Sequence, residues 1–260
     1  MSAVTDHERP SGPDPGDERF LIVCTGRDGS TLLSAILAAA GANFGEPEKQ
    51  DWDPRAGAYE SWTAARASAH YNRFIDLNED SFLSRWMRLK RRYHRIWAKA
   101  LAKRYFSRVH FAKIGAAHRF PQLVRLVGFR PVIVLLYRDY HTQFASAFVR
   151  KPFSYDELVD KYFSTLATGL ISLSLYGGCI LRYEEVIDPD ARDWANRLGE
   201  ACRIPPERLL QARAAILKRT GAVEEANPYV MDDARLDGLM ARLDELRPLR
   251  HVAGRLGERV

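Results

Sequence analysis

A glycine-rich turn with the sequence Gly26-Arg27-Asp28-Gly29-Ser30-Thr31 follows the apolar run Phe20–Cys24 and precedes LLSAILAAAG, a segment rich in helix formers. A turn from a strand into a helix directs backbone NH groups and the positive end of the helix dipole at an anion. The sequence therefore predicts a phosphate cradle, to which Arg27 can add a bidentate contact. The alternative is a purely structural turn in which Ser30 caps the helix and Asp28 completes the turn.

The turn differs from the loop that binds nucleoside triphosphates. That loop, GxxxxGK[ST], needs a lysine before its hydroxyl residue to reach the terminal phosphates. Here Gly29 is followed directly by Ser30. The missing lysine argues against hydrolysis of ATP or GTP.

A second pair of residues that can bind an anion lies further along the chain. Arg138 follows the apolar run Pro131–Tyr137, and Ser146 comes eight residues later in a segment with a helical pattern. Eight residues place the two side chains roughly 80° apart around a helix axis. If Arg138 lies at the start of that helix, both can meet one phosphate.

The elements that must position these residues alternate between strands and helices. Strands are predicted at 20–24, 109–114, 131–137 and 179–183, and helices at 32–41, 120–127, 140–150, 155–175, 191–202, 206–217 and 232–256. Such alternation predicts an α/β fold: a single P-loop-type domain whose central, mostly parallel sheet is flanked by helices. Parallel sheets of this kind bind ligands at the carboxyl ends of their strands.

Length and composition fit one globular domain. The chain has 260 residues, of which 46% are hydrophobic and 28% charged. We expect residues 1–18, which are polar and rich in Pro, Gly and Asp, to form a disordered leader before a domain spanning 19–260. Three cysteines without a CxxC pair indicate buried thiols in a reducing compartment, and no long apolar run is present, so a cytoplasmic protein is expected.

The net charge of +6 is concentrated between Arg85 and Arg108, where aromatic residues alternate with basic ones. One interpretation is a surface for an anionic substrate, a phospholipid or a nucleic acid. The other, which we prefer from the sequence, is an amphipathic helix whose aromatic side chains pack inward while its arginines face solvent. Residues 52–108 would then form a helical insertion on the acceptor side of the domain.

Several motifs together resemble the PAPS-dependent sulfotransferase superfamily. RDGSTLL (27–33) resembles its 5′-phosphosulfate loop, YRDYHTQFAS (137–146) its 3′-phosphate motif, and LRYEEV (181–186) its later strand-end pattern. GEPE (45–48) and the lysine of FAKIG (111–115) are similar to segments of the bacterial carbohydrate sulfotransferases of the trehalose 2-sulfotransferase type. The resemblance runs from about residue 20 to residue 198.

The resemblance implies the cofactor PAPS, with PAP as product, and roles for individual residues. A C-terminal segment, about 218–260, would close over the nucleotide, with Arg219 in the match KRTG. Asp28 departs from the usual serine and places a negative charge beside an anion unless it pairs with Arg27. The residues that would hold the 5′-phosphosulfate are Arg27, Gly29, Ser30 and Thr31, and those that would hold the 3′-phosphate are Arg138 and Ser146.

Sulfuryl transfer needs in-line geometry, charge stabilisation and a base for the acceptor hydroxyl. Glu46 and Glu48 resemble the acidic base region of the relatives, with Glu46 preferred, and His118 is the alternative base. Lys113 is a candidate for positioning the sulfuryl group, or it extends from a strand end to solvent. No metal site is expected, since the histidines are scattered.

The expected acceptor is a hydroxyl-bearing small molecule or glycan, and its identity stays open. No nucleic-acid partner is expected, and a peripheral contact with a membrane is compatible with the basic segment. Three other interpretations stay open. The first is a nucleotide kinase or other phosphotransferase, and the second is a non-catalytic protein that binds nucleic acid or membrane through residues 85–108. The third is a sulfotransferase fold that has lost its activity, as Asp28 would allow.

Overall fold

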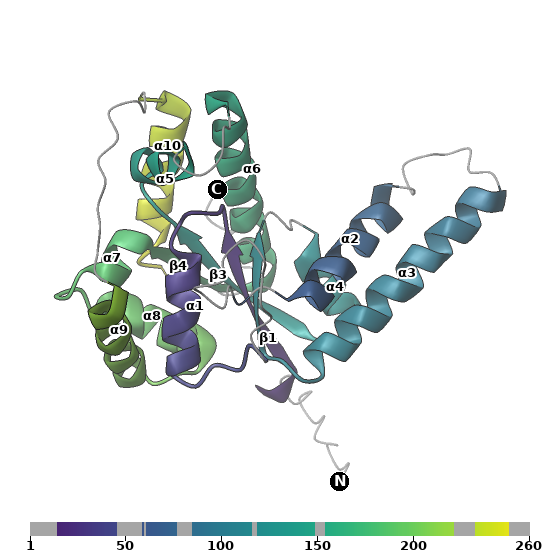
Figure 1. Cartoon of the computed structure of the whole chain (residues 1–260), viewed down its shortest axis with the longest axis horizontal. Coiled ribbons are helices and arrows are strands. Elements are labelled where there is room, and N and C mark those ends of the chain that lie inside the picture. Colours follow the sequence, from purple (N-terminus) through teal and green to yellow (C-terminus); the bar gives the residue numbers. More distant parts are fainter. Residues whose placement is uncertain are drawn as a thin grey trace, which may run out of the picture.

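A computed structural model of the chain describes residues 15–45, 59, 61–76, 85–115, 119–148, 154–220 and 232–249. At its centre lies a sheet of four strands in the order β2-β1-β3-β4, with helices on both faces (Figure 1). All neighbouring strands are parallel. The predicted α/β fold with a parallel sheet is therefore confirmed. The strands are β1 (Glu18–Cys24), β2 (Phe111–Gly115), β3 (Arg130–Tyr137) and β4 (Gly178–Arg182).

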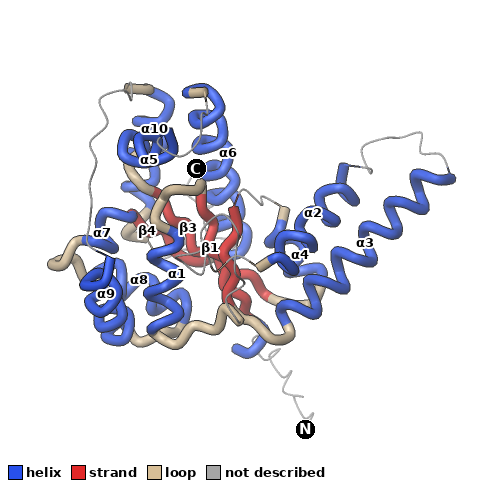
Figure 2. Tube along the Cα trace, in the orientation of Figure 1, coloured by secondary structure: helices blue, strands red, loops and turns tan. Residues whose placement is uncertain are grey.

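The helices form two layers, each with its own hydrophobic core against one face of the sheet (Figure 2). One layer contains α1 (Ser30–Ala39), α7 (Tyr183–Ile187), α8 (Asp193–Cys202) and α9 (Pro206–Thr220). The other contains α2 (Trp62–Asp76), α3 (Arg85–Phe106), α4 (Phe120–Leu126), α5 (Tyr140–Phe148), α6 (Tyr155–Tyr176) and α10 (Ala234–Leu246).

The apolar runs form strands because their side chains alternate between these two cores. On β1, Leu21 joins the core beneath α6, whereas Phe20 and Ile22 join the core beneath α1. On β3, Ile133 and Val134 divide in the same way, and both are fully buried. A strand covered on both faces needs apolar residues at every position, which explains the continuous runs.

The strand order creates a switch point between β1 and β3. The chain leaves β1 for β2 on one side and later returns to β3 on the other, so the segments after β1 and β3 diverge at the carboxyl edge of the sheet. Open α/β sheets bind their ligands in the crevice at such a point. The predicted phosphate turn follows β1 and Arg138 follows β3, so both candidate motifs lie at this edge of the sheet.

Helices α2 and α3 form a paired arm that extends away from the sheet (Figure 1). Tyr105 and Phe106, at the sheet end of α3, are buried as expected. Trp86, Tyr93 and Trp97 are 62%, 51% and 44% exposed, so the prediction that the aromatic residues of this segment pack inward is wrong for these three. The cause is the reach of the arm, since the outer part of α3 lies beyond the core that could cover them.

Several element boundaries differ from expectation. Residues 15–17 form a turn of 3₁₀ helix and Glu18, with its side chain buried, opens β1, so the predicted disordered leader is wrong for residues 15–18. Tyr183 begins α7 instead of ending β4. Helix α10 ends at Leu246, short of the predicted Leu256, and residues 1–14 and 250–260 lie outside the described residues.

Two further findings concern the whole described chain. The three cysteines are buried, as predicted, and form no disulfide. Burial raises the pKa of the Cys179 thiol to about 12. None of the helices in the described ranges is long and apolar enough to cross a membrane.

Candidate functional site

The turn after β1 has a conformation that few sequences tolerate. Gly26, Arg27 and Gly29 all have positive φ, at 84°, 63° and 83°. Glycine adopts this region freely, whereas an arginine there is strained, and such strain is concentrated at functional sites. Successive backbone NH groups in such turns form concave anion-binding nests, and the first NH groups of α1 have no acceptor within the helix. The turn therefore has the backbone geometry that anion-binding nests use.

Asp28 holds this turn from within. Its carboxylate is fully buried and accepts hydrogen bonds from the backbone NH of Thr25 at 2.6 Å and of Ser30 at 3.1 Å. The expectation that Asp28 would confront an incoming anion unless it paired with Arg27 is therefore replaced. The carboxylate closes the turn on its buried side, where it accepts from the Ser30 NH.

Tyr183, the first residue of α7, fixes the other side of the turn. A Cβ atom on residue 29 would overlap Cδ2 and Cε2 of its ring, so the tyrosine packs directly on Gly29. The guanidinium of Arg138 lies over the same ring, 4.6 Å from its centroid. Tyr183 thus connects the two predicted anion-binding motifs, although sequence analysis gave it no role.

Arg27 and Ser146 are in direct contact. Nε and Nη2 of Arg27 donate to Oγ of Ser146 at 3.0 and 2.8 Å. Nη1 of Arg138 donates to the carbonyl oxygen of Arg27 at 3.5 Å, a long hydrogen bond. The structure therefore brings Arg27, Arg138 and Ser146 together across 119 residues of sequence. The Ser146 hydroxyl still has its own hydrogen to donate, since it acts here as an acceptor.

Arg138 retains a donor that nothing in the described structure satisfies. Its Nε is buried and has no hydrogen-bond partner among the described residues. A buried charged donor without an acceptor costs free energy. The acceptor that it lacks is the kind of group a bound phosphate oxygen provides.

Two lysines from other elements also approach the turn. Lys113 on β2 is buried, and its Nζ donates to Oγ1 of Thr31 at 2.9 Å. Lys161 on α6 places its Nζ 3.7 Å from where a Cβ on Gly26 would lie. Sequence analysis named Lys113 but missed Lys161, and no spacing in the sequence could have linked residue 161 to a turn 135 positions earlier.

Gln143 is a further contact that sequence analysis missed. It is buried on α5, and its Nε2 donates to Oγ1 of Thr25 at 2.6 Å and to the carbonyl oxygen of Gly26 at 2.7 Å. The residue lies within the motif YRDYHTQFAS, one helical turn before Ser146. Its place in this motif, on the side of the helix after β3 that faces the turn, is the feature of the sequence that could have indicated a contact with the turn.

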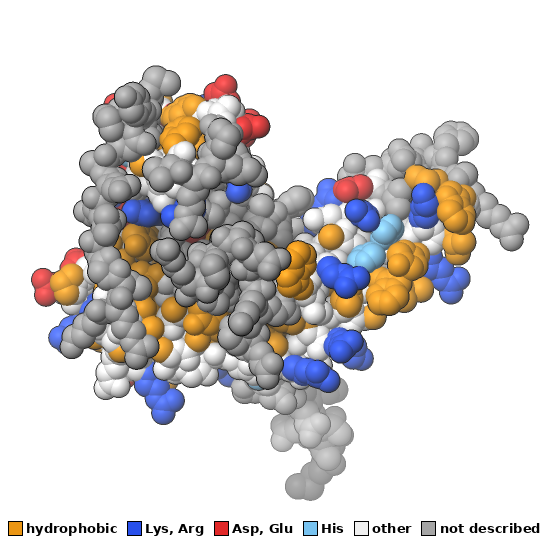
Figure 3. Space-filling view, in the orientation of Figure 1, with side chains coloured by type: hydrophobic (Ala, Val, Ile, Leu, Met, Phe, Trp, Pro, Cys, Tyr) orange, Lys and Arg blue, Asp and Glu red, His pale blue; other side chains and the backbone are white. Residues whose placement is uncertain are grey.

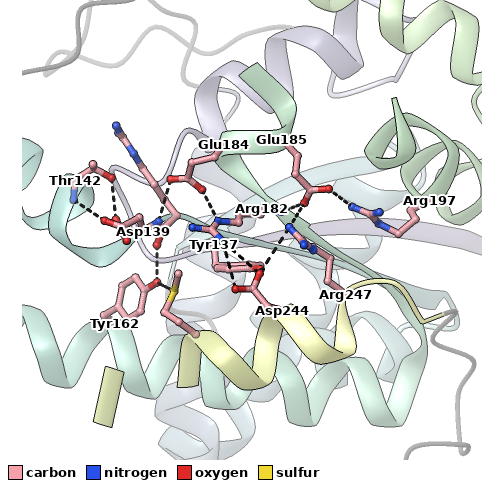
Figure 4. Close-up of polar contacts among 12 residues, drawn as sticks. Tyr137, Asp139, Thr142, Tyr162, Arg182, Glu184, Glu185, Arg197, Asp244 and Arg247 are labelled. Atoms are coloured by element: carbon pink, nitrogen blue, oxygen red, sulfur yellow. Dashed lines mark hydrogen bonds and ion pairs between the residues drawn. The ribbon is translucent and has the colours of Figure 1, made fainter. Parts of the chain in front are cut away.

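A network of charged and polar groups surrounds the backbone where β3 ends, at Tyr137 and Asp139 (Figure 4). The hydroxyl of Tyr162 donates to the carbonyl oxygen of Arg138 at 2.6 Å, and Glu184 accepts from the NH of Asp139 at 3.1 Å. Tyr137 donates to Asp244 of α10 at 2.5 Å. Burial raises the pKa of Tyr137 and of Tyr162, so both hydroxyls stay protonated donors.

The same network attaches the C-terminal helix to the site. Asp244 also pairs with Arg182 at the end of β4, at 3.3 Å. Glu185 pairs with Arg247 at 2.7 Å and with Arg197 at 2.7 Å (Figure 4). Helix α10 therefore packs where the strands β3 and β4 end, next to the candidate site.

Several predicted residues cannot be placed. Glu46, Glu48 and His118, the candidate bases, lie outside the described residues. Arg219 belongs to α9, but its side chain is outside the described part of the structure. Within the described ranges, no group of three or more His, Cys, Asp or Glu side chains is placed to hold a metal ion. The grouped residues are Arg27, Asp28, Gly29, Ser30, Thr31, Lys113, Arg138 and Ser146.

Comparisons with protein-family models, with curated proteins and with solved structures find no match for this chain.

Proposed function

We propose that the chain is a sulfotransferase that moves a sulfuryl group from PAPS to a hydroxyl of a small-molecule, carbohydrate or lipid-linked acceptor. The observation that supports this proposal best is the meeting of the turn after β1 with Arg138 and Ser146 after β3. PAPS carries two separate anionic groups, a 5′-phosphosulfate and a 3′-phosphate. Two adjacent motifs of the kind that bind anions suit such a donor better than a ligand with a single anionic end.

The chemistry of the donor set fits the two groups. The backbone NH groups of the turn, together with Thr31, would hold the 5′-phosphosulfate, and Asp28 keeps the turn in shape for it. The unsatisfied Nε of Arg138 and the hydroxyl of Ser146 would hold the 3′-phosphate. Arg27 already donates to Ser146, so its guanidinium lies between the two sites and can contact either anion.

Catalysis would then depend on orientation and charge. PAPS supplies the sulfuryl group, whose bond to the phosphate oxygen breaks as the acceptor oxygen bonds to sulfur. Arg27 and the NH groups of the turn would stabilise the negative charge that develops on the leaving phosphate. Lys113, held by Thr31 at the start of α1, would orient the phosphosulfate. The acceptor proton would pass to Glu46, Glu48 or His118, and the choice among these bases stays a prediction.

One observation favours a second function, a nucleotide-dependent phosphotransferase. Lys113 and Lys161 bring ammonium groups to the turn from β2 and α6. Either could replace the lysine that nucleoside-triphosphate loops carry and that the turn after β1 lacks. Such an enzyme would bind ATP with magnesium instead of PAP.

The thermal unfolding midpoint separates the two functions. Excess PAP at about 100 times its dissociation constant should stabilise the protein by about 2.7 kcal/mol, which is roughly 5–10 °C for a domain of this size. The shift should vanish in Arg138→Ala and shrink in Ser146→Ala, and it should persist in Arg125→Ala, an exposed arginine on α4. A shift with ATP and magnesium but none with PAP would establish the phosphotransferase and overturn the sulfotransferase.

A further inference from the structure

The outer face of helix α3 carries a stripe of exposed apolar side chains. Leu89 and Ile96 are 59% and 56% exposed, and they alternate with aromatic residues that are exposed to a similar degree. Their spacing of three and four residues puts them in one arc of about 100° along the helix. Figure 3 shows hydrophobic side chains along the arm. The stripe consists of Trp86, Leu89, Tyr93, Ile96 and Trp97.

A second apolar face of α3 already makes the contacts that hold the arm to the body. Ala98 and Ala102 on this face are fully buried, and Tyr105 is buried near the sheet. The rings of His70 on α2 and His94 on α3 meet on the same side, with their Nδ1 atoms 2.8 Å apart. Two stripe residues, Tyr93 and Trp97, also place their rings 5.9 and 6.4 Å from the ring of His70, but they stay 51% and 44% exposed. Exposed apolar side chains that gather on one face of a helix indicate an interaction surface.

Charges beside the stripe have a single sign. Helix α3 contains nine Lys and Arg residues and no Asp or Glu. By the geometry of an α-helix, five of them occupy an arc of about 80° next to the stripe. On the stripe itself, Nζ of Lys90 lies 5.5 Å from the centroid of the Trp86 ring. The five residues of this basic band are Arg88, Arg92, Arg95, Lys99 and Lys103.

The two features together select one kind of partner. A second copy of the chain would bring nine cations of one α3 against nine of the other, so like charges would oppose pairing through the stripe. A nucleic acid would neutralise the basic band but would leave Leu89 and Ile96 without apolar contacts. An anionic bilayer meets both needs, because its headgroups attract the cations and its acyl chains bury the apolar side chains, with tryptophan at the boundary.

We propose that the α2–α3 arm is a membrane-docking device, in which α3 lies in the plane of an anionic phospholipid surface with the stripe inserted and the basic band at the headgroups. A helix of this length would cover about 33 Å of that surface. The proposal depends on α3 alone and does not depend on the proposed enzymatic function.

Cosedimentation of the full chain with vesicles tests this proposal. The protein should bind vesicles of phosphatidylcholine with phosphatidylglycerol, and it should bind phosphatidylcholine alone far more weakly. The stripe variant Leu89→Ser/Ile96→Ser should lose at least tenfold in affinity. The band variant Arg88→Gln/Arg92→Gln should lose about 30-fold, which is about 2 kcal/mol for two cations near an anionic surface, and this loss should shrink in high salt.

Matched control variants separate docking through α3 from nonspecific binding to vesicles. Ile171→Ser/Leu175→Ser removes two apolar side chains of α6 that are 60% and 56% exposed, and it should leave binding unchanged. Arg192→Gln/Arg208→Gln removes two exposed arginines elsewhere and should have little effect. All of these positions are exposed, so the variants should fold, which circular dichroism checks.

Three results would overturn the proposal. Equal binding by the stripe variant and the original chain would show that the apolar side chains do not insert. A dimer in sedimentation experiments that the stripe variant abolishes would make a second copy the partner. Tight binding of duplex DNA that the band variant weakens and the stripe variant does not, with no vesicle binding, would make nucleic acid the partner.

Discussion

Replacing Gly29 with alanine should destabilise the protein through two separable effects. The first is conformational, because a residue with a Cβ in the left-handed region costs about 1–2 kcal/mol. The second is a clash, because the new methyl group would overlap the ring of Tyr183, and carbon atoms pack no closer than about 3.5–4.0 Å. Moving the ring would cost about 1–3 kcal/mol as overpacking and would disturb its contact with Arg138. The expected total is about 2–5 kcal/mol.

Urea unfolding of a small set of variants measures both effects. Gly128→Ala is the conformational control, because Gly128 also has positive φ, at 96°, and has nothing within 4 Å of an added Cβ. It should lose only about 1–2 kcal/mol. In Gly29→Ala/Tyr183→Ala the clash disappears, so the double variant should be more stable than the sum of the single effects by about 1–3 kcal/mol. Equal losses for Gly29→Ala and Gly128→Ala, or simple additivity, would refute the packing of Tyr183 on the turn.

Three other variants test the support of the site and the arm. Asp28→Ala should lower the free energy of unfolding by about 2–6 kcal/mol, because two backbone NH groups lose a buried acceptor. Asp28→Asn should lower it by less. If urea unfolding finds Asp28→Asn as unstable as Asp28→Ala, or less stable, the role of the carboxylate is contradicted. Tyr137→Phe removes the hydrogen bond to Asp244 and should lower the free energy of unfolding by about 1.5–3 kcal/mol. An unchanged urea midpoint would show that this bond is absent. Burial and neighbouring cations lower the pKa of His70 and His94 in the folded state. The folded protein therefore keeps its full stability above the ordinary histidine pKa of about 6.5 and loses stability as the pH falls below it. The thermal midpoint should fall between about pH 7 and 5, and this fall should be smaller in His94→Leu.

Local patterns were sufficient to predict the core of the fold. The run Pro131–Tyr137 is apolar at every position because both faces of β3 are covered, and that pattern indicates a buried parallel strand. The turn after β1 was also predictable, since glycines at 26 and 29 between a strand and a helix indicate left-handed backbone. Both motifs then reach one edge because parallel strands share a direction.

The contacts that complete the site could not be predicted in the same way. Tyr183 and Lys161 reach the turn from α7 and α6, and their approach depends on how these helices pack on the sheet. The exposure of Trp86 was also missed, because a helix that is apolar on two faces has the same composition whether one face or both are covered. Its solvent-facing stripe follows from the direction of the arm, a tertiary property.

The proposed sulfotransferase function requires that the turn after β1 and the Arg138–Ser146 pair bind two anionic groups of one nucleotide. Isothermal titration with PAP and with AMP, which lacks the 3′-phosphate, tests it most directly. The original chain should bind PAP about 10- to 100-fold more tightly than AMP, as one charge-assisted contact implies, and Arg138→Ala should bind the two nucleotides nearly equally. Equal affinities for PAP and AMP in the original chain, or a preference for PAP that survives in Arg138→Ala, would contradict the claim.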